Sequence, residues 1–462
     1  METNQNPTPV TSFFQSNTAR LIMIGLLTLI LLIPLQLVKG LITERAQRQS
    51  EVINEINSKW GEEVFFYGPI LKVPYTTYTK SEVYDKTTGT TVTQKTAEQN
   101  FAYFFPEELK NTSDIKTETK KRNNYESVVF KAQMDFRGNY VKPDFSSKNI
   151  PDEDIQWDKA TIIVRTSNQS SIKDGAFINI GGNKFVFEPV YENSKNDSDV
   201  VSYDRRNFPK YTKVSTLETP FIDFKDYFEN SDFSFSFKYD GSSKISIVPI
   251  GKTTEATMKS DWKDPKFDGT FLPTHNVTDN GFTADWKVLH INRPFSQQSF
   301  GFLPNISEYA FNVDFIIPVD EYQQNERASK YGFLTIGLTF LIFFLIQTIS
   351  KIKIHIFQYT MIGLALIMFY TLLISITEHS SFLKAYLISG ASVIALISLY
   401  SISVLKNKKF PLFIGLSLSA LYGFIFVIIQ LENYALLAGS IGLFLILATV
   451  MFVSRKIDWN RN

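Results

Sequence analysis

The 462-residue sequence contains no cysteine and only four histidines. Without cysteine the chain cannot form a disulfide, a thiolate nucleophile, a Cys-ligated zinc site or an iron–sulfur cluster. His275 and His290 lie fifteen residues apart on different predicted elements, and no HxxxH or HxH spacing occurs. A histidine metal site needs two or three converging ligands. We therefore expect no metal and no cofactor, and we interpret both histidines as held by local hydrogen bonds.

The usual signatures of catalysis are also missing from the sequence. There is no GxSxG or SxxK nucleophile motif, and the glycine-containing stretches lack both the GxxxxGK[ST] and the GxGxxG spacing. A Ser-His-Asp triad remains open, because its members meet in space and not in sequence. The poor catalytic inventory nevertheless favours a protein that is not an enzyme.

Charge is absent from the middle of six long apolar runs. The runs are 21–38, 331–349, 356–377, 385–405, 410–430 and 434–453. Each is long enough to cross a bilayer as a helix. Coupled transporters usually carry ionisable groups near the membrane midplane, so these spans argue against coupled transport. Their serines and threonines fit close helix packing, with a polar conduit as the alternative.

The first apolar run, Leu21 to Val38, has two interpretations. A cleaved signal peptide is one of them, but the run is long for a signal core. It is followed by "KGLITERAQRQ" and not by a small-residue cleavage site. These features favour an uncleaved membrane anchor, in which Pro34 is placed to kink the helix.

The joints between the runs alternate in charge. "SKIKIH", "KNKK" and the tail "SRKIDWNRN" are basic, whereas "TEHSSFLK" and "LEN" each hold one acid and at most one lysine. The positive-inside rule places the basic joints in the cytoplasm. We therefore predict a cytoplasmic tail (1–20), a first span (21–40), an outer domain (41–330), a five-helix membrane bundle (331–454) and a second cytoplasmic tail (455–462).

The outer domain, residues 41–330, holds 36 Lys and Arg against 42 Asp and Glu. This acidic balance gives no electrostatic basis for binding nucleic acid. Directly after the first span, Ile42, Ala46, Ile53, Ile56 and Trp60 fall near one face of an amphipathic stalk helix.

Strand signals dominate the rest of the outer domain. Apolar and polar residues alternate in "KFVFEPVY", "FSFSFKYDGSSKISIVPIG" and "YAFNVDFIIPV". Further strands are expected near 69–85, 98–105, 125–139, 160–167, 255–262 and 281–291. Asp240-Gly241 predicts a hairpin turn, and the Asn/Ser/Lys-rich segment 194–213 predicts loops. The fold class is therefore a six-helix membrane protein with a large antiparallel β-rich extracytoplasmic domain.

One long stretch resembles a signature of the CreD family of bacterial inner-membrane proteins. The signature combines Val-Pro-x-Gly, Ser-x-Trp, Pro-x-Phe-x-Gly-x-Phe-Leu-Pro and Gly-Phe-x-Ala-x-Trp. Its residues here are Val248, Pro249, Gly251, Ser260, Trp262, Pro265, Phe267, Gly269, Phe271, Leu272, Pro273, Gly281, Phe282, Ala284 and Trp286. "IPLQLVKGLITERAQRQ", "GPILKVP", "PVDEYQQNERASKYGFLTIGLTFLIFF", "ISITEHSSFLKAYLIS" and "RKIDWN" are similar to further family stretches in the expected order.

The resemblance covers essentially the whole chain and implies a setting in the bacterial inner membrane. It implies a role in cell-envelope integrity, colicin tolerance and the response to β-lactam stress, without a molecular activity. One stretch departs from the family pattern. Where relatives tend to have Ser-Asp-x-Arg-Gly-Ile, this chain reads "SNQSSI", with Asn168, Ser170 and Ser171. Any function of that Asp-Arg pair is absent here.

Three hypotheses follow. The leading one is an envelope protein whose outer domain binds or senses a glycan, a lipid or a membrane protein. The alternatives are a transporter or flippase-like conduit through the bundle, and an enzyme using Glu378 and His379 as acid and base. We interpret "TEHSSFLK" mainly as a polar outer hinge suited to dock the β-rich domain. The candidate interaction residues are Trp262, Pro265, Phe267, Phe271, Trp286, Tyr322, Arg327, Glu378 and His379. For the aromatic ones, core packing is the competing interpretation, and for Tyr322 and Arg327 it is interface anchoring.

Overall fold

The computed structural model describes residues 17–85, 90–190, 199–203, 209–315, 317, 321–350, 352–405, 409–431 and 434–455. Residues 1–16 of the first predicted tail, and 456–462 of the second, lie outside this range. So do four joint residues used to predict orientation, Lys351, Lys406, Lys408 and Glu432. The chain divides into two compact units, one formed by 1–51 with 319–462 and the other by 52–318. We call them the membrane unit and the β unit.

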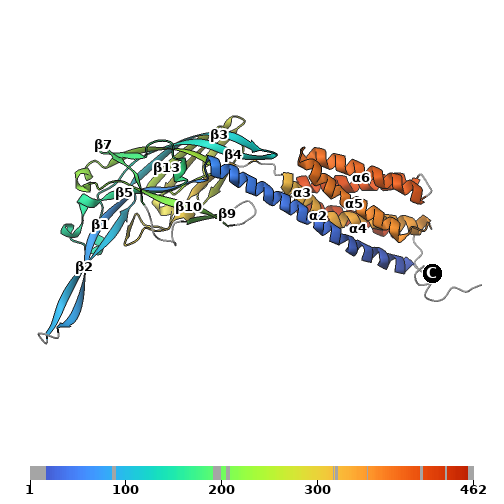
Figure 1. Ribbon diagram of the computed structural model, residues 1–462, viewed down its shortest axis with the longest axis horizontal. Coiled ribbons are helices and arrows are strands. Elements are labelled where there is room, and N and C mark those ends of the chain that lie inside the picture. Colours follow the sequence, from blue (N-terminus) through green and yellow to red (C-terminus); the bar gives the residue numbers. More distant parts are fainter. Residues whose placement is uncertain are drawn as a thin grey trace, which may run out of the picture. The chain divides into compact units, whose positions relative to one another are not determined.

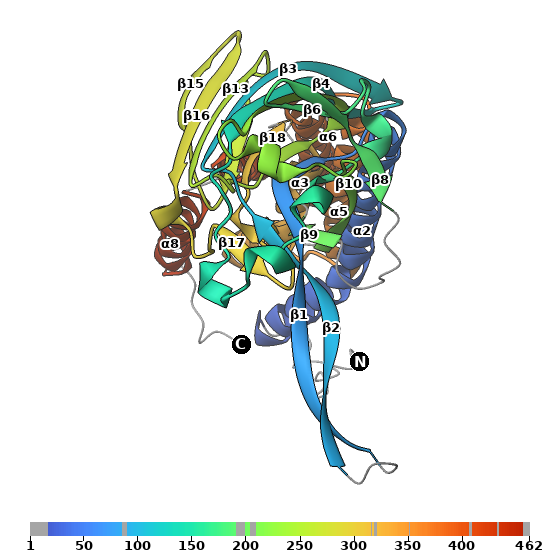
Figure 2. The ribbon, with the colours of Figure 1, turned by 90° about the vertical axis from the view of Figure 1, so that its left-hand side faces the viewer.

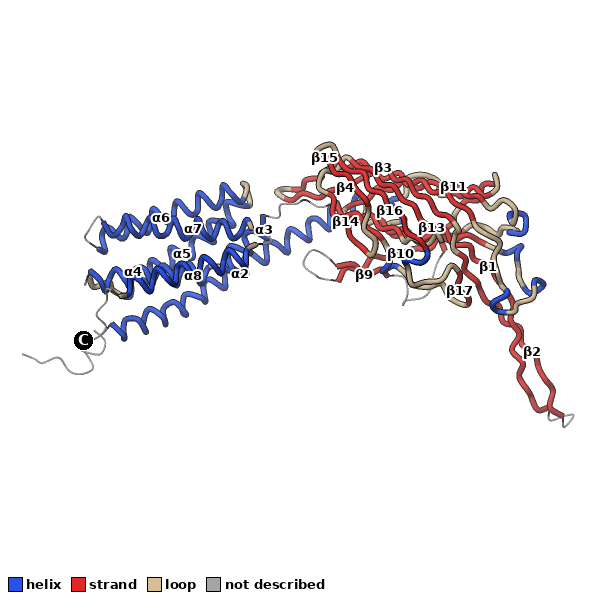
Figure 3. The backbone as a smooth tube through the Cα atoms, turned by 180° about the vertical axis from the view of Figure 1, so that it is seen from behind, coloured by secondary structure: helices blue, strands red, loops and turns tan. Residues whose placement is uncertain are grey.

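Six helices are long and apolar enough to cross a membrane, which confirms the predicted count within the described residues. They are α2 (Asn17–Trp60), α4 (Gly332–Ser350), α5 (Ile356–Thr377), α6 (Phe382–Leu405), α7 (Lys409–Gln430) and α8 (Ala435–Ser454). A short amphipathic helix, α3 (Glu321–Lys330), precedes α4. Figure 3 distinguishes these helices from the strands of the β unit.

The core of the membrane unit is built from aliphatic and aromatic side chains on every long helix except α8. Leu27, Leu31 and Leu35 of α2 belong to this core, so the first span packs with the C-terminal helices. In contrast, α8 contributes no buried residue and packs on α7. Helix α2 continues through Pro34 to Trp60 and so includes the predicted stalk, in which Ile42 and Ala46 are buried.

The β unit contains two sheets. The ten-stranded sheet runs β14-β18-β12-β1-β5-β10-β8, with β2, β17 and β9 paired at its sides, and the eight-stranded sheet runs β15-β16-β13-β3-β4-β11-β6-β7. The first sheet comprises β1 (Val64–Asp85), β2 (Thr90–Phe104), β5 (Thr161–Ser167), β8 (Glu188–Val190), β9 (Asp199–Tyr203), β10 (Pro209–Glu218), β12 (Lys244–Ile247), β14 (Pro265–Gly269), β17 (Gln298–Phe300) and β18 (Phe311–Phe315). The second comprises β3 (Glu108–Arg122), β4 (Tyr125–Asn139), β6 (Phe177–Ile180), β7 (Asn183–Val186), β11 (Asp232–Ser242), β13 (Thr253–Ser260), β15 (Thr274–Thr278) and β16 (Gly281–Leu289).

Most strand pairs are antiparallel, as the alternating sequence pattern predicted, but β1–β12 and β3–β13 are parallel. The sheets are therefore mixed. Aromatic rings from both sheets meet in one core: Phe66 of β1 stacks on Phe136 of β4 with centroids 4.3 Å apart, and Phe136 stacks on Phe235 of β11 at 4.7 Å. Offset ring pairs of this kind add to the free energy gained by burying their apolar area.

The predicted hairpin turn at Asp240-Gly241 is wrong. Both residues lie inside β11, where they pair with Lys131 and Phe130 of β4. Gly241 is needed there because a Cβ would collide with the ring of Phe130. The chain turns at Ser243, which has φ 63°, and then enters β12 of the other sheet. The connection is thus a crossover between sheets.

Two further segments differ from the sequence prediction. Segment 194–213 was expected to be loops, yet its described residues form β9 and the first half of β10, which pair antiparallel between Tyr203 and Pro209 and on to Asp199 and Lys213. Residues 194–198 and 204–208 lie outside the described residues. Strand β3 was not predicted at all. Its inward positions include Asn111 and Ser113, which are polar and nearly fully buried, so its pattern lacks the usual apolar alternation.

Strands β1 and β2 extend past the sheet as a long two-stranded hairpin, as Figures 1 and 2 show. They remain in register from Leu71–Phe104 to Asp85–Thr90, and their described side chains from Tyr78 onward on β1 are exposed.

The end of α2 is fixed to the β unit by polar contacts. Asn57, which is buried, donates to Ser243 and accepts from the hydroxyl of Ser127 at 2.6 Å. Arg122 of β3 pairs with Glu55 at 2.5 Å. The last turns of α2 therefore form part of the β unit.

Candidate functional site

The aromatic signature forms the corner where the two sheets meet. Strand β14 is at the edge of the ten-stranded sheet, and β15 and β16 are at the edge of the eight-stranded sheet. The chain passes from β13 to β14, and then back to β15 and β16, so this one segment crosses between the sheets twice.

Trp286 on β16 is the centre of this corner. It is 3% exposed, and its indole stacks on Phe311 of β18, in the other sheet, with centroids 4.8 Å apart. Its Nε1–H donates to the carbonyl of Phe271 at 3.0 Å. Phe267 of β14 packs edge-on against it at 6.1 Å. Trp286 therefore joins both sheets and the connecting loop, which favours packing as its main role.

The other aromatic candidates lie around this centre and are half-buried. Trp262 donates from Nε1 to the carbonyl of Asp264 at 3.0 Å, within its own loop. Phe267 packs on the exposed His275 with centroids 4.6 Å apart, and Pro265 begins β14 opposite Phe315. The signature candidates are thus gathered in one place, as a packed corner whose outer surface is partly open.

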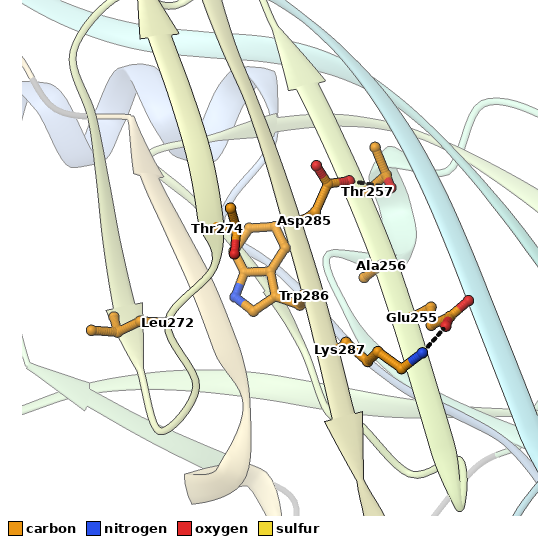
Figure 4. Close-up of a pocket in the computed structure, with 8 residues that line it drawn as sticks. All are labelled: Glu255, Ala256, Thr257, Leu272, Thr274, Asp285, Trp286 and Lys287. Atoms are coloured by element: carbon orange, nitrogen blue, oxygen red, sulfur yellow. Dashed lines mark hydrogen bonds and ion pairs between the residues drawn. The ribbon is translucent and has the colours of Figure 1, made fainter.

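A cleft of about 430 Å³ opens on this corner. We call it the signature cleft; its lining is Glu255, Ala256, Thr257, Leu272, Thr274, Asp285, Trp286 and Lys287. Figure 4 shows Leu272 and the Glu255–Lys287 pair on opposite sides of Trp286. Leu272 is 72% exposed, so the cleft offers an apolar side chain beside charged ones.

Charges of both signs line the cleft. Lys287 Nζ lies 2.9 Å from a carboxylate oxygen of Glu255, and the hydroxyl of Thr257 donates to Asp285 at 2.6 Å. The hydrogen bond from Lys287 holds the pKa of Glu255 below its usual value and raises the pKa of Lys287. Both pairs are exposed, so their exchange for a polar ligand costs little.

A buried arginine supports the corner, and sequence reasoning missed it. Arg293 is 6% exposed and donates to the carbonyls of Ile250 and Gly251 at 3.1 Å each, and to that of Phe295 at 2.9 Å. Burial lowers its pKa to about 10, so it stays charged at neutral pH. Its place in "NRPF" carried no signal, because its partners Ile250 and Gly251 are more than forty residues away.

The departure "SNQSSI" forms a structural junction. Asn168 adopts a left-handed conformation with φ 56°, which asparagine tolerates better than most residues. Its Nδ2 donates to the carbonyls of Glu62 at 3.1 Å and Asp240 at 2.9 Å. The segment thus connects the end of β5 to the residues just before β1 and to the last part of β11.

The remaining candidates come together in the membrane unit. Helix α3 buries Tyr322 and Asn325 against the long helices, and Asn325 accepts from the hydroxyl of Thr377, at the end of α5, at 3.4 Å. Arg327 donates to the carbonyl of Ile429 near the end of α7 at 3.5 Å. Helix α3 therefore caps the ends of α5 and α7.

Glu378 and His379, the acid–histidine pair of the sequence, have different surroundings in the same region. Glu378, which ends α5, pairs with Arg45 of α2, with Nε and Oε1 3.4 Å apart. His379 lies in the following turn and is exposed. The carboxylate is therefore directed toward α2, and the residue that sequence reasoning overlooked is Arg45, hidden among the charges of "TERAQRQ".

The nine candidates thus form two groups, one in each unit. His275 and His290 are both exposed in the β unit, on β15 and just after β16. Across the part of the chain that the structure describes, no group of three or more His, Asp or Glu is placed to hold a metal ion.

Six membrane-spanning helices with a large mixed β-sheet domain inserted after the first define a multi-pass membrane protein. Comparison with known proteins gives the particular family. The family model described as "Inner membrane protein CreD" matches residues 16–460. The curated protein "Inner membrane protein CreD" of Escherichia coli (strain K12) is 28% identical over 446 residues, covering 93% of this chain and 91% of that protein. The chain belongs to the CreD family and is an inner-membrane protein of the envelope.

Proposed function

We propose that this protein supports cell-envelope integrity and stress or colicin tolerance without catalysis, by binding a polar envelope glycan in the signature cleft. The observation that supports the proposal is the composition of the cleft. It combines the exposed Leu272 and the edge of Trp286 with Lys287, Asp285 and Glu255. Ligand sites typically combine apolar walls with a few convergent polar groups.

The chemistry of the cleft suits a hydroxyl-rich ligand. Glycan hydroxyls donate to the carboxylates of Asp285 and Glu255 and accept from Lys287, while a sugar ring packs on Leu272. The indole of Trp286 is too buried to serve as a stacking platform. The polar rim of the cleft, formed by Glu255, Asp285 and Lys287, therefore selects the ligand, and the aromatic core does not.

This function is tested by replacing the rim. The double variant Asp285→Ala/Lys287→Ala is expected to lose envelope-stress tolerance while its abundance in the membrane is unchanged. The matched control is Asp174→Ala/Lys238→Ala, which removes another exposed pair, 2.7 Å apart, outside the cleft. A photoreactive residue at position 272 should crosslink to glycan in cells. Full tolerance of the rim variant would overturn the proposal.

The proposed topology has both termini in the cytoplasm and residues 41–330 in the periplasm, following the charge alternation of the joints. Two exposed histidines flank one helix and test it: His355 caps the start of α5 and His379 follows its end. Because the chain has no cysteine, each can be changed to cysteine singly. His379→Cys should react with an impermeant maleimide from the periplasm, whereas His355→Cys should react only after lysis. The reverse pattern would invert the topology.

A conduit through the bundle is the second candidate function. It is supported by buried polar groups between the helices, among them Ser389 and Tyr422, whose hydroxyls make no hydrogen bond to described residues. Cysteines placed along α6 and α7 distinguish this candidate. Labelling at buried positions supports a water-filled path, and labelling restricted to the joints excludes one.

A further inference from the structure

A groove of about 750 Å³ lies between α4, α7 and α8 of the membrane unit. Its lining extends along α4 from Leu338 to Ile349, along α7 from Lys409 to Phe424, and along α8 from Gly442 to Val453. Almost all of these side chains are apolar, and Lys409 is the charged one among them.

The groove arises from the way α8 crosses α7. At Gly442 the ring of Phe424 lies against the backbone of α8, where a Cβ would collide with it. Toward Lys409, α7 presents the small side chains of Ser417 and Ala420, which do not fill the space between α4 and α8. Because proteins rarely leave an apolar space of this size empty, we expect apolar groups from the bilayer to fill the groove.

The length of the groove bears on what occupies it. From Lys409 to Phe424 the α7 wall is about 22 Å long at 1.5 Å per residue. The hydrocarbon core of a bilayer is about 30 Å thick, so the groove is longer than one leaflet and shorter than the whole core. A single extended acyl chain that enters from one membrane surface matches this length.

The charge at one end of the groove indicates the head group. Ile349, Lys409 and Val453 line the same end, because α4 and α8 finish there and α7 begins there. Exposed Lys353 and Arg455 follow Ile349 and Val453 within about one helical turn. The described residues of these joints, 350, 352–355, 409–410 and 454–455, include no Asp or Glu. This end therefore complements an anionic phosphate.

We propose that the groove is a binding site for an anionic phospholipid, with one acyl chain between α4 and α8 and the phosphate at Lys409. In the topology proposed above, this site faces the inner leaflet. The lipid supplies the packing that α8 lacks on its α4 side. The lipid is a structural component of the membrane unit, and its binding does not depend on any ligand in the β unit.

The test uses the full-length protein purified in mild detergent, with phosphatidylglycerol and phosphatidylcholine of identical chains as probes. Phosphatidylglycerol should raise the melting temperature more than phosphatidylcholine, and native mass spectrometry should show it retained. Lys409→Gln should weaken phosphatidylglycerol binding about fivefold, as expected for one basic residue at an anionic lipid. The matched control, Lys384→Gln, removes an exposed lysine near the start of α6 and should change nothing.

Filling the groove provides a second arm. Ala420→Phe should abolish lipid retention, and the smaller Ser417→Leu should reduce it if the larger change impairs folding. Equal stabilisation by both lipids, or retention unaffected by Lys409→Gln and by both filling variants, would overturn the proposal. Protein dimerisation through α8 that Ala420→Phe abolishes would assign the groove to a second copy and also overturn it.

Discussion

The β unit and the membrane unit both bury many aromatic side chains, but they connect the chain in opposite ways. In the β unit, core contacts join distant segments: β1 pairs with β12, and Phe66 stacks near Phe235. In the membrane unit, α5, α6, α7 and α8 pack mainly on their neighbours in sequence. A single residue can therefore hold two sheets together in the first unit, whereas most helices of the second contact more than one other helix, with α8 as the exception.

The polar groups show the same difference. In the β unit, buried Asn57 and Arg293 connect separate segments through several hydrogen bonds each. In the membrane unit many buried hydroxyls, such as those of Thr339 and Ser401, donate to the carbonyl one turn earlier on their own helix. Polar substitutions should thus be costly at the sheet corner and mild at the ends of the bundle.

The largest effect is expected for Trp286→Ala. The change removes the ring that packs on Phe311 of the opposite sheet, and large-to-small core changes of this kind cost about 3–5 kcal/mol. Hydrogen exchange in the full-length protein should show β16 and β18 losing protection together. Trp262→Ala, which removes a half-buried ring bonded within its own loop, is the control and should change little. Equal effects of the two variants would contradict the special place of Trp286.

Arg293→Met should have the next largest effect. It removes the 3.1 Å hydrogen bonds to the carbonyls of Ile250 and Gly251, which keep only longer ones of 3.4 Å from Gln297 and Thr254. Loss of hydrogen bonds from a buried charged group costs about 1–3 kcal/mol. Arg293→Lys restores the charge but cannot bond several carbonyls at once, so it should be intermediate. Chemical denaturation, followed by tryptophan fluorescence, gives the free energies of unfolding of the parent protein, Arg293→Lys and Arg293→Met, which should decrease in that order. A stability of Arg293→Met equal to the parent would show that water replaces the guanidinium.

The spans could be predicted from sequence because each one is a single apolar run, a signal that needs no tertiary contact. The strand at 125–139 could be predicted as well, because its inward residues alternate as apolar side chains. Prediction failed where contacts with a distant part of the chain determine the local structure. Strand β3 buries the polar Asn111 and Ser113, and Asn111 donates to the carbonyl of Asp135 on the neighbouring strand β4. Gly241 is in a strand because Phe130 leaves no room for a side chain.

The candidate site, too, could be predicted where the signal is local and could not be predicted where it depends on distant partners. The aromatic signature was recognised from the chain itself, and it does form one corner. The rim of the cleft was not predicted, because Glu255 and Lys287 belong to strands that only pairing brings together. Glu378 was noticed for its neighbour His379, yet its partner is Arg45, more than three hundred residues away.

A small effect is expected for Glu378→Gln in the membrane unit. Its pair with Arg45 is partly exposed, and such pairs contribute about 0–1 kcal/mol. Thermal unfolding in detergent should change by a few degrees at most, and envelope-stress tolerance should be retained. His379→Ala should behave likewise. Loss of tolerance in both variants at normal abundance would instead favour acid–base chemistry at this turn.

The smallest expected effect concerns the cleft pair and its dependence on pH. The hydrogen bond from Lys287 lowers the pKa of Glu255 below its usual value of 4.5. Because the pKa is lower in the folded than in the unfolded protein, the pair stabilises the fold fully above about pH 4.5. This contribution is lost as the pH falls through the lower, folded value. A double-mutant cycle of Glu255→Gln and Lys287→Met isolates it from the other carboxylates, which titrate in the same range.

The coupling between Glu255 and Lys287 should be measurable at pH 7 and should decrease toward zero in increasingly acidic buffer. Ligand binding provides the link to function, because a rim that remains ionised above pH 4.5 keeps both hydrogen-bond acceptors and a donor for a glycan. Coupling that persists unchanged at the lowest pH at which the protein stays folded would show that the two residues interact through their aliphatic stems. In that case even the rim of the β unit would depend on packing more than on charge.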